Sequence, residues 1–277
     1  MKIIDGKTLA QNLRKKIANQ VKQYSRPPGL AVILVGDDEA SQLYVRNKTR
    51  ACVEVGFYSD QIHKSSNITE EELLSEVNRL NENQNIDGIL VQLPLPLHID
   101  SNKIIEAIIP EKDVDGFSSE NVGKLSQNKS FISPCTPKGV MKMLDSIKCD
   151  LRGKDCVIIG ASNIVGRPMA MELLNAGATV QVCHKGTKEI THKTKSADVI
   201  IAAAGVANLV KSDWIKEGVI LIDVGINRQA DGSMTGDVDF EDVNGIASAI
   251  TPVPGGVGPM TIAVLLENTL IAYEAKL

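Results

Sequence analysis

The sequence predicts an α/β protein of two domains, each built on a parallel sheet covered by helices. Three observations lead to this prediction. Single helices and apolar strands alternate over residues 9–110, and a second alternating series begins near residue 136. The segment between them, residues 118–136, is polar, is poor in periodic apolar positions and is predicted to be a connection. At 277 residues the chain is long enough to form two hydrophobic cores.

The first series opens with a helix and continues with a buried strand. Apolar residues recur at helical spacing from Leu9 to Val21, and the apolar run at 30–36 has the length of a strand. Thr69 and Glu72 form a capping box that starts another helix. The remaining predicted elements are a helix over 41–55, a strand over 57–64, a strand over 88–94 and a helix that follows Asp100 and ends before Pro110.

The second series begins at Thr136 and Pro137, which suit the N-cap and first position of a helix. A βαβ succession typical of a doubly wound, Rossmann-type domain follows. Its predicted elements are strand 156–160, helix 165–176, strand 179–183, helix 188–196, strand 198–202 and strand 219–224. The predicted domains are therefore residues 1–136 and 137–259. The last helix, 260–277, has an apolar face, and packing back on the first domain is one option for it.

Composition limits the classes of protein that the chain can represent. The net charge of −4 gives no general reason to expect nucleic acid or an anionic membrane as a partner. The sequence has no signal peptide and no apolar stretch of transmembrane length, so a cytoplasmic location is expected. Five widely spaced cysteines without a Cys-x-x-Cys pair indicate reduced thiols and no zinc site. We expect no metal.

The stretch Gly160 to Pro168 indicates a dinucleotide-binding turn, because it follows an apolar strand and opens a helix. Such a turn offers backbone N–H groups and the positive end of a helix dipole to a pyrophosphate. Ser162 replaces the usual middle glycine, and the closing glycine comes late, at Gly166. Taken alone, the pattern is also compatible with an ordinary strand-to-helix connection.

Residues after the next strand favour NADP over NAD. NAD sites usually carry an acidic residue there, which binds the ribose hydroxyls and would repel a 2′-phosphate. This chain has His184, Lys185 and Thr187 instead, with Arg167 as a further candidate cation. The alternative is a solvated loop whose charge has no role.

Tyr44 and Lys48 form a candidate catalytic pair in the first domain. On a helix, residues four apart share one face and lie about 6 Å apart along the axis. A lysine that loses its proton can act as a base, and burial lowers its pKa toward neutrality. The alternative is an aromatic ring covered by a lysine stem.

Two strand ends supply further polar groups. Gln92 ends an otherwise apolar strand, at the edge where ligands bind in open α/β sheets. Asp113 and Asp115 precede Gly116, and a carboxylate there can accept two parallel N–H bonds from an aminopyrimidine edge. The alternatives are a glutamine bonded to backbone and an Asx turn. Residues 251–261 are rich in glycine and proline. The prolines indicate a stiff loop, and the glycines allow its backbone to approach a flat ligand closely.

These stretches together resemble one family, the bifunctional methylenetetrahydrofolate dehydrogenase/cyclohydrolases. The resemblance covers nearly the full chain, in the family's order and spacing. Its motifs are Ile4 to Lys7, Ser41 to Lys48, Val91 to Pro96, Lys112 to Gly116, Pro134 to Pro137, Gly160 to Pro168, Asp223 to Asn227, Gly236 to Val238 and Thr251 to Thr261.

The resemblance implies hydride transfer from methylenetetrahydrofolate to NADP, then hydrolysis of the methenyl product to formyltetrahydrofolate, within a cleft between an N-terminal catalytic domain and an NADP-binding domain. It implies a homodimer and a link to purine biosynthesis. Lys48 matches the catalytic lysine, Gln92 its partner, Tyr44 the ring that stacks on the substrate and Asp115 the carboxylate that binds the pterin. Substrate-contacting positions also include Pro254, Gly255 and Gly256, and cofactor-contacting positions are Gly160, Ala161, Ser162, Val165, Gly166, Arg167, His184, Lys185 and Ile226.

Two departures from the family bear on cofactor choice. Many members have arginine where this chain has Ala161, and serine or arginine within the positions of His184 to Gly186. The missing arginine weakens the prediction of NADP specificity, and Lys185 is the expected compensation. Two alternatives stay open from the sequence: another two-domain NADP dehydrogenase, acting on a hydroxy acid or a shikimate-like alcohol, and a nucleotide-binding regulatory module.

Overall fold

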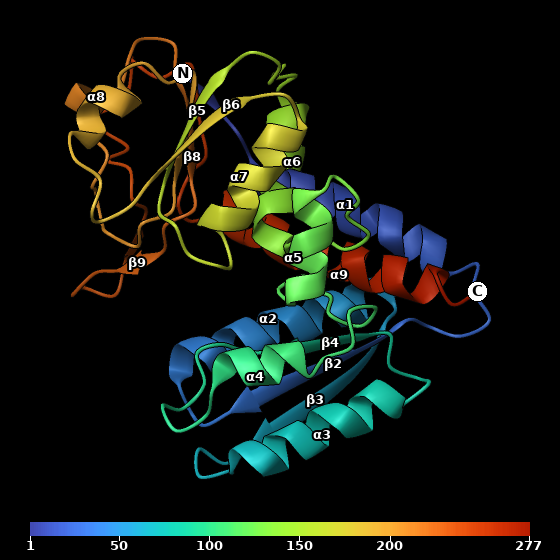
Figure 1. The fold of residues 1–277 in the computed structure, drawn as a ribbon. Coiled ribbons are helices and arrows are strands. Elements are labelled where there is room, and N and C mark those ends of the chain that lie inside the picture. The colour runs from blue at the N-terminus through green and yellow to red at the C-terminus, as the bar shows by residue number, and fades with distance from the viewer. The chain divides into compact units, whose positions relative to one another are not determined.

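A computed structural model describes all residues, 1–277. The chain folds into two compact units, each formed by two segments (Figure 1). The Lys48 unit comprises Gln11–Cys135 and Ile262–Leu277, and the Gly160 unit comprises Met1–Ala10 and Thr136–Thr261. Residues 1–10, which the sequence analysis assigned to the first domain, thus belong to the unit that carries the Gly160 turn. No helix combines the length and apolar character needed to cross a membrane.

The Lys48 unit is built on a three-stranded parallel sheet in the order β3-β2-β4. The central strand, β2 (Gly29–Val35), is buried along its whole length, which explains its unbroken apolar sequence. Strand β4 (Gly88–Val91) is also buried, whereas the edge strand β3 (Tyr58–Lys64) carries exposed residues.

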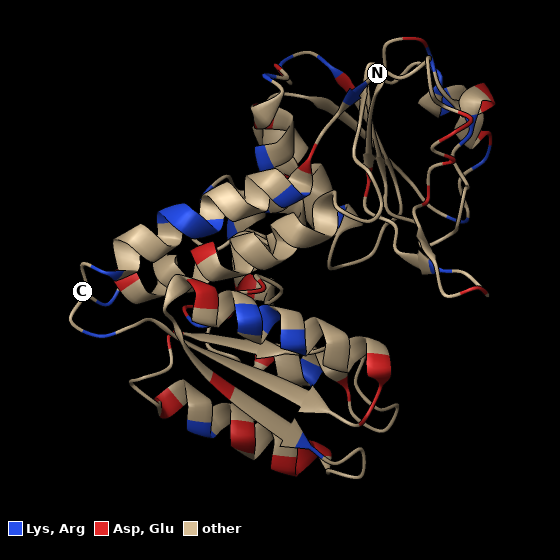
Figure 2. Ribbon diagram, turned by 180° about the vertical axis from the view of Figure 1, so that it is seen from behind, with Lys and Arg blue, Asp and Glu red and all other residues tan.

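Helices cover both faces of this sheet. Residues of β2 that point to one face, such as Ile33, pack with α3 (Glu70–Glu82) and α4 (Ser101–Glu106). Residues that point to the other face, such as Val32, belong to a cluster with α1 (Gly6–Val21), α2 (Glu39–Val55) and α9 (Val257–Glu274). Part of the last helix therefore completes the core of the Lys48 unit. Residues of both charge signs are interspersed over the helices (Figure 2).

The Gly160 unit contains a six-stranded sheet in the order β1-β11-β8-β7-β5-β6. All recorded pairings in it are parallel. Its first long strand, β5, has β6 on one side and β7 on the other, as in a doubly wound fold. The strands are β1 (Lys2–Ile3), β5 (Asp155–Ile159), β6 (Thr179–Cys183), β7 (Val199–Ala202), β8 (Ile220–Asp223) and β11 (Ala249–Ile250).

Connections in the Gly160 unit include α6 (Cys135–Ser146), α7 (Gly166–Asn175), α8 (Ile190–Thr194), and η1 (Ser212–Trp214). A small antiparallel pair, β9 (Asn227–Arg228) with β10 (Met234–Thr235), follows β8. One buried cluster joins apolar residues of β5, β7, β8 and β11, including Ile159, Ile200, Leu221 and Ile250.

Two predictions about the connecting segment were wrong. Residues 118–136 are not irregular throughout, because α5 (Ser119–Ser126) forms there with Ser118 as its N-cap. Helix α6 begins at Cys135, so Thr136 lies within the helix and is not its cap. The Thr136 hydroxyl instead lies 2.9 Å from the hydroxyl of Thr261.

Candidate active site

Lys48 and Gln92 meet at the carboxyl edge of the sheet in the Lys48 unit. Lys48 lies on α2, and its Nζ donates to Oε1 of Gln92 at 2.9 Å. Gln92 directly follows β4, and its own Nε2 donates to the carbonyl of Leu93 at 2.7 Å. This second bond fixes the orientation of the amide, so its oxygen faces the lysine. A partly buried lysine is thereby held in one position.

Tyr44 lies one helical turn before Lys48 and is exposed by 36%. Its neighbours shield it enough that partial burial raises the pKa of the phenol above its ordinary value. The phenol therefore stays neutral near pH 7, and the ring offers an accessible aromatic surface. Such a surface suits the flat ring of a substrate.

Asp115 comes close to the lysine from a different part of the chain. Asp113 forms a parallel bridge with Ile89 of β4, so Asp115, two residues further, lies beside the end of that strand. The pKa of the Asp115 carboxyl is raised to about 6, mainly because the group is buried, and neighbouring Asp113 contributes in the same direction. Lys48 and the thiol of Cys135 act in the opposite direction. The carboxylate is thus partly desolvated without full compensation from the protein.

Asp113 holds the loop that carries Asp115, a role that the sequence analysis did not assign. Its carboxylate accepts from the backbone N–H groups of Gly116 at 3.0 Å and Ser118 at 2.8 Å. The side chain of Asn121 donates to it at 3.0 Å. Position 116 also requires glycine, since φ is +75° and a Cβ would lie 2.8 Å from Pro134 N.

The Gly160 turn has the close packing expected of a dinucleotide site. Gly160 has φ +127°, and a Cβ there would come within 2.0 Å of the carbonyl of Ala203. A Cβ on Gly166 would come within 2.1 Å of the Gly160 carbonyl. The Ser162 hydroxyl accepts from the backbone N–H of Val165 at 3.2 Å, and so shapes the entry to α7. Backbone can therefore approach a pyrophosphate at the start of this helix, and the residues fit a dinucleotide.

A compact turn follows β6, where the sequence predicts contacts with the adenosine half of the cofactor. The backbone N–H of Gly186 donates to Nδ1 of His184 at 3.1 Å, and His184 N donates to the Thr187 hydroxyl at 2.9 Å. The His184 ring is therefore engaged within its own turn. Lys185 is exposed at the tip of the same turn. The predicted contacts of Lys185 and His184 with the cofactor stay predictions.

The other predicted positions belong to loops of the Gly160 unit. Arg167 donates from Nε to the carbonyl of Ala161 at 3.3 Å, which ties its side chain to the turn. Ile226, after β8, is exposed by 44%. The loop with Pro254, Gly255 and Gly256 is anchored at the start of α1, where Lys7 N donates to the Gly255 carbonyl at 2.9 Å.

The structure also shows two buried carboxylates that lie within the sequence motifs and for which no role was predicted. Asp223 and Asp237 accept hydrogen bonds from backbone groups of several loops beside β7 and β8. The sequence signal for these carboxylates is the pair of nearby glycines, Gly225 and Gly236. A Cβ on Gly225 would overlap the carboxylate of Asp237, and a Cβ on Gly236 would overlap that of Asp223. No group of three or more His, Cys, Asp or Glu side chains that could hold a metal is found.

Fold and site together define a class: a two-unit α/β dehydrogenase whose dinucleotide domain is accompanied by a second unit with a lysine-centred polar site. Comparison with known proteins gives the family. The chain matches two family models, "Tetrahydrofolate dehydrogenase/cyclohydrolase, catalytic domain" over residues 4–115 and "Tetrahydrofolate dehydrogenase/cyclohydrolase, NAD(P)-binding domain" over residues 134–277. The chain belongs to the tetrahydrofolate dehydrogenase/cyclohydrolase family.

Individual relatives agree with this assignment. The chain is 63% identical over 277 residues to the bifunctional protein FolD of Ruthia magnifica, with both chains fully covered. It also resembles the crystal structure of the bifunctional enzyme FolD from Campylobacter jejuni, with 55% identity, complete coverage of both chains and a TM-score of 0.98. A Trypanosoma brucei FolD solved with NADP and an inhibitor is 38% identical, with a TM-score of 0.94 over 99% of this chain and 97% of that one.

These findings confirm the predicted family, fold class and enzyme class. The chain is a bifunctional enzyme of one-carbon folate metabolism, a methylenetetrahydrofolate dehydrogenase and a methenyltetrahydrofolate cyclohydrolase. Its cofactor is a nicotinamide dinucleotide, because the matched family domain is NAD(P)-binding. The roles of individual residues remain predictions, which the geometry above makes testable.

Proposed function

We propose that Lys48, Gln92, Tyr44 and Asp115 form the folate site and that Lys48 serves both reactions. The observation that carries this proposal is the 2.9 Å hydrogen bond between Lys48 and Gln92, with Asp115 close enough to interact electrostatically with the same lysine. Residues 44 apart in the sequence thereby form one polar cluster. Tyr44, one turn away, adds an accessible ring for stacking.

Asp115 is suited to bind the pterin. An ionised carboxylate accepts two parallel N–H bonds, which matches the amino group and ring N–H of an aminopyrimidine. Burial has already raised the pKa of this carboxyl to about 6, so it is incompletely compensated in the free protein. Donors from the substrate would supply the missing compensation.

Lys48 and Gln92 are suited to the chemistry at the one-carbon bridge. NADP, when bound, accepts the hydride of the dehydrogenase reaction. In the hydrolysis, water adds to the electron-poor methenyl carbon, one C–N bond of the bridge breaks and a proton is released. We assign to Lys48 the handling of protons and the orientation of that water, and to Gln92 the positioning of Lys48. Pro254, Gly255 and Gly256 are proposed to contact folate on the resemblance alone.

The test compares wild type with Lys48→Ala and with Lys16→Ala, which alters an exposed lysine on α1 and serves as a matched control. Purified protein is mixed with methylenetetrahydrofolate and NADP, and absorbance of the reduced cofactor and of the methenyl product is followed. We expect Lys48→Ala to lose both activities and Lys16→Ala to keep them. Absence of reduced cofactor with wild type would reject the dehydrogenase assignment, and a Lys48 variant that keeps both activities would reject the role of Lys48.

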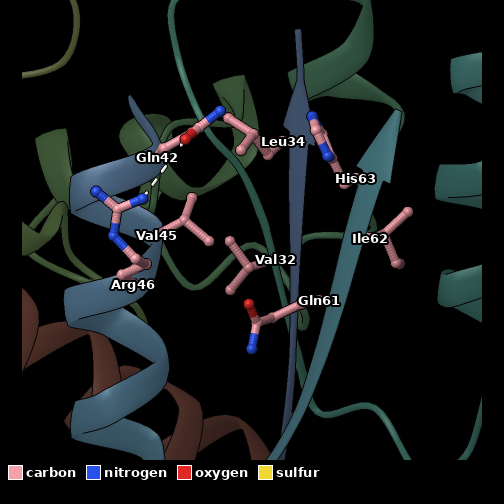
Figure 3. A pocket seen from close by; sticks show the side chains of 8 residues that line it. All are labelled: Val32, Leu34, Gln42, Val45, Arg46, Gln61, Ile62 and His63. Atoms are coloured by element: carbon pink, nitrogen blue, oxygen red, sulfur yellow. Dashed lines mark hydrogen bonds between the residues drawn. The ribbon is translucent and has the colours of Figure 1, made fainter. Parts of the chain in front are cut away.

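We also propose that the chain forms a homodimer through the free edge of β3. This seven-residue strand pairs with β2 on one side only. Beside it, a hollow of about 240 Å³ opens between α2 and the sheet (Figure 3). It is lined by Val32, Leu34, Gln42, Val45, Arg46, Gln61, Ile62 and His63. A second copy that adds its own β3 would satisfy the free edge and cover this hollow.

Sedimentation velocity tests the dimer. Tyr58 N donates to the Pro28 carbonyl, so even-numbered residues of β3 bond toward β2, and the N–H of Gln61 points outward. Gln61→Pro therefore removes an outward donor without removing a bond to β2. We expect wild type to sediment as a dimer and this variant as a monomer. A monomeric wild type would refute the proposal.

We place the enzyme in the cytoplasm and propose that its formyltetrahydrofolate serves purine biosynthesis. All five cysteines are free thiols, which is typical of a reducing compartment. The product is an activated formyl donor, and a reaction that transfers formyl groups to amines is the kind that would consume it. A deletion strain that grows only when purine and formate are added would support the link to purine biosynthesis.

A further inference from the structure

Asp237 is the most extensively hydrogen-bonded carboxylate in the Gly160 unit. It is fully buried. One oxygen, Oδ2, accepts from the backbone N–H groups of Ala204 at 2.6 Å and Gly205 at 2.9 Å. The other, Oδ1, accepts from Val206 N at 3.0 Å and from Nδ2 of Asn227 at 2.9 Å. These four bonds use about the full acceptor capacity of a carboxylate.

A second carboxylate holds Asp237 in place. Asp223 accepts from the backbone N–H of Asp237 at 2.9 Å through Oδ1 and from Val238 at 2.8 Å through Oδ2. Asp223 is itself tied to the Thr251 hydroxyl, which accepts from its backbone N–H at 2.7 Å. The loops that follow β7 and β8 and the stretch at 236–238 are thus linked by charge-assisted hydrogen bonds.

The segment held by Asp237 lies where the sheet changes its winding. It directly follows β7, which pairs with β5, the strand that immediately precedes Gly160. The two loops touch, because a Cβ on Gly160 would come within 2.0 Å of the Ala203 carbonyl. In doubly wound sheets, the dinucleotide crosses the carboxyl edge at this point. Lys185, after β6, marks the side of the adenosine half, so the nicotinamide half extends over β7 and β8.

We propose that Asp237 is a positioning residue for the dehydrogenase reaction: it fixes the backbone of Ala204 to Val206 and, through Asn227, the Ile226 segment against the nicotinamide half of NADP. This inference rests on the proposed cofactor site. It assigns no part of the hydrolysis to Asp237, because hydrolysis of the methenyl carbon consumes water and no hydride acceptor. The two activities therefore separate a positioning role from a general contribution to folding.

The decisive variant is Asp237→Asn. Asparagine keeps one acceptor oxygen and turns an NH2 group toward two N–H donors, so one pair of donors loses its acceptor whichever way the amide faces. Asp242→Asn is the matched control. That aspartate is exposed and accepts from one backbone N–H, Ser212 N at 2.7 Å, away from the cofactor loops.

Three measurements on the full chain are needed: NADP affinity by calorimetry, dehydrogenase kinetics with varied NADP, and hydrolysis of methenyltetrahydrofolate without dinucleotide. For Asp237→Asn we expect Kd for NADP to rise about tenfold or more and kcat/KM for NADP to fall at least as far, because small misplacements of a binding loop cost one to two orders of magnitude. Hydrolysis should stay within about twofold of wild type, and Asp242→Asn should match wild type throughout.

The inference would be overturned if Asp237→Asn bound NADP as tightly as wild type. It would also be overturned if both activities fell equally and calorimetry showed fewer NADP-binding sites per protein, because that result indicates misfolding. If this variant does not fold, Asn227→Ala replaces it, since it removes one donor and leaves the buried carboxylate with three. A weaker but selective loss of NADP affinity would then support the inference, and unchanged affinity would refute it. A wild-type protein that neither binds nor reduces NADP would instead refute the proposed function, so the two failures are distinguishable.

Discussion

Replacing Asp115 with asparagine should make the free enzyme more stable at pH 8 while it weakens folate binding. Burial raises the pKa of this carboxyl from 3.8 to about 6, so the folded protein favours the protonated acid. Its contribution to stability is fully present below the ordinary pKa and is lost as pH rises through about 6. Two pKa units at 1.36 kcal/mol each correspond to about 3 kcal/mol lost by pH 8.

Asparagine is neutral at every pH and nearly the same size, so the variant escapes this loss. The free energy of unfolding of Asp115→Asn minus that of wild type should increase between about pH 4 and pH 6 and become constant above about pH 7. The attraction of Lys48 is already included in the pKa of Asp115, so no further correction for that pair is needed. Folate affinity should fall by about one to two orders of magnitude, because one acceptor of a charged bidentate pair is lost.

Urea unfolding followed by circular dichroism from pH 4.5 to 8 measures the difference, and calorimetry with a folate ligand measures binding. Glu111→Gln is the matched control, since it neutralises an exposed carboxylate four residues earlier. It should show no such pH-dependent gain. A stability difference that is the same at pH 4.5 and pH 8, or a variant less stable than wild type at pH 8, would refute the reasoning.

Two further predictions concern cofactor choice and the core. Lys185→Ala should lower kcat/KM for NADP about tenfold and leave kcat/KM for NAD unchanged. Lys188→Ala, which alters an exposed lysine, is the control. Comparable turnover of wild type at low NADP and at low NAD would contradict the predicted preference for NADP. Asp87→Asn should lower the free energy of unfolding by about 3 kcal/mol, because it removes the charge of a buried carboxylate that is bonded to Arg26 at 2.7 and 2.8 Å and to Lys276 at 3.0 Å. Thermal unfolding with Asp60→Asn as control would check it, and an unchanged Tm would count against it.

The main helices and strands of both units could be predicted because they bury regular apolar patterns. Strand β2, buried throughout, is unbroken in its apolar sequence, and α3 begins at the predicted capping box of Thr69 and Glu72. Helix α5 was missed because its formation depends on contacts with residues outside the helix. Its buried residues are Asn121 and Leu125, and Asn121 is held by the Pro110 carbonyl and by Asp113. Tertiary hydrogen bonds of this kind leave no periodic trace in the sequence.

The candidate site, like the fold, could be predicted from the sequence only in part. Spacing alone places Tyr44 and Lys48 on one helical face, but the bond from Lys48 to Gln92 joins residues 44 apart and needs the fold to form. The motif Gly236 to Val238 was visible in the sequence without a function. Its aspartate serves N–H groups 31 to 33 residues earlier, so only the tertiary structure could show what it holds.

The environments of Asp115 and Asp237 account for the two different roles that we propose for one residue type. A buried carboxylate loses hydration and is stable only when donors replace the water. Around Asp237 the protein supplies four donors, so no acceptor is left over for a ligand and the residue fixes loops. Around Asp115 the donors do not offset burial, as the raised pKa shows. The remaining acceptor capacity is what a pterin needs, and the same incomplete compensation is why removing the charge should stabilise the free enzyme.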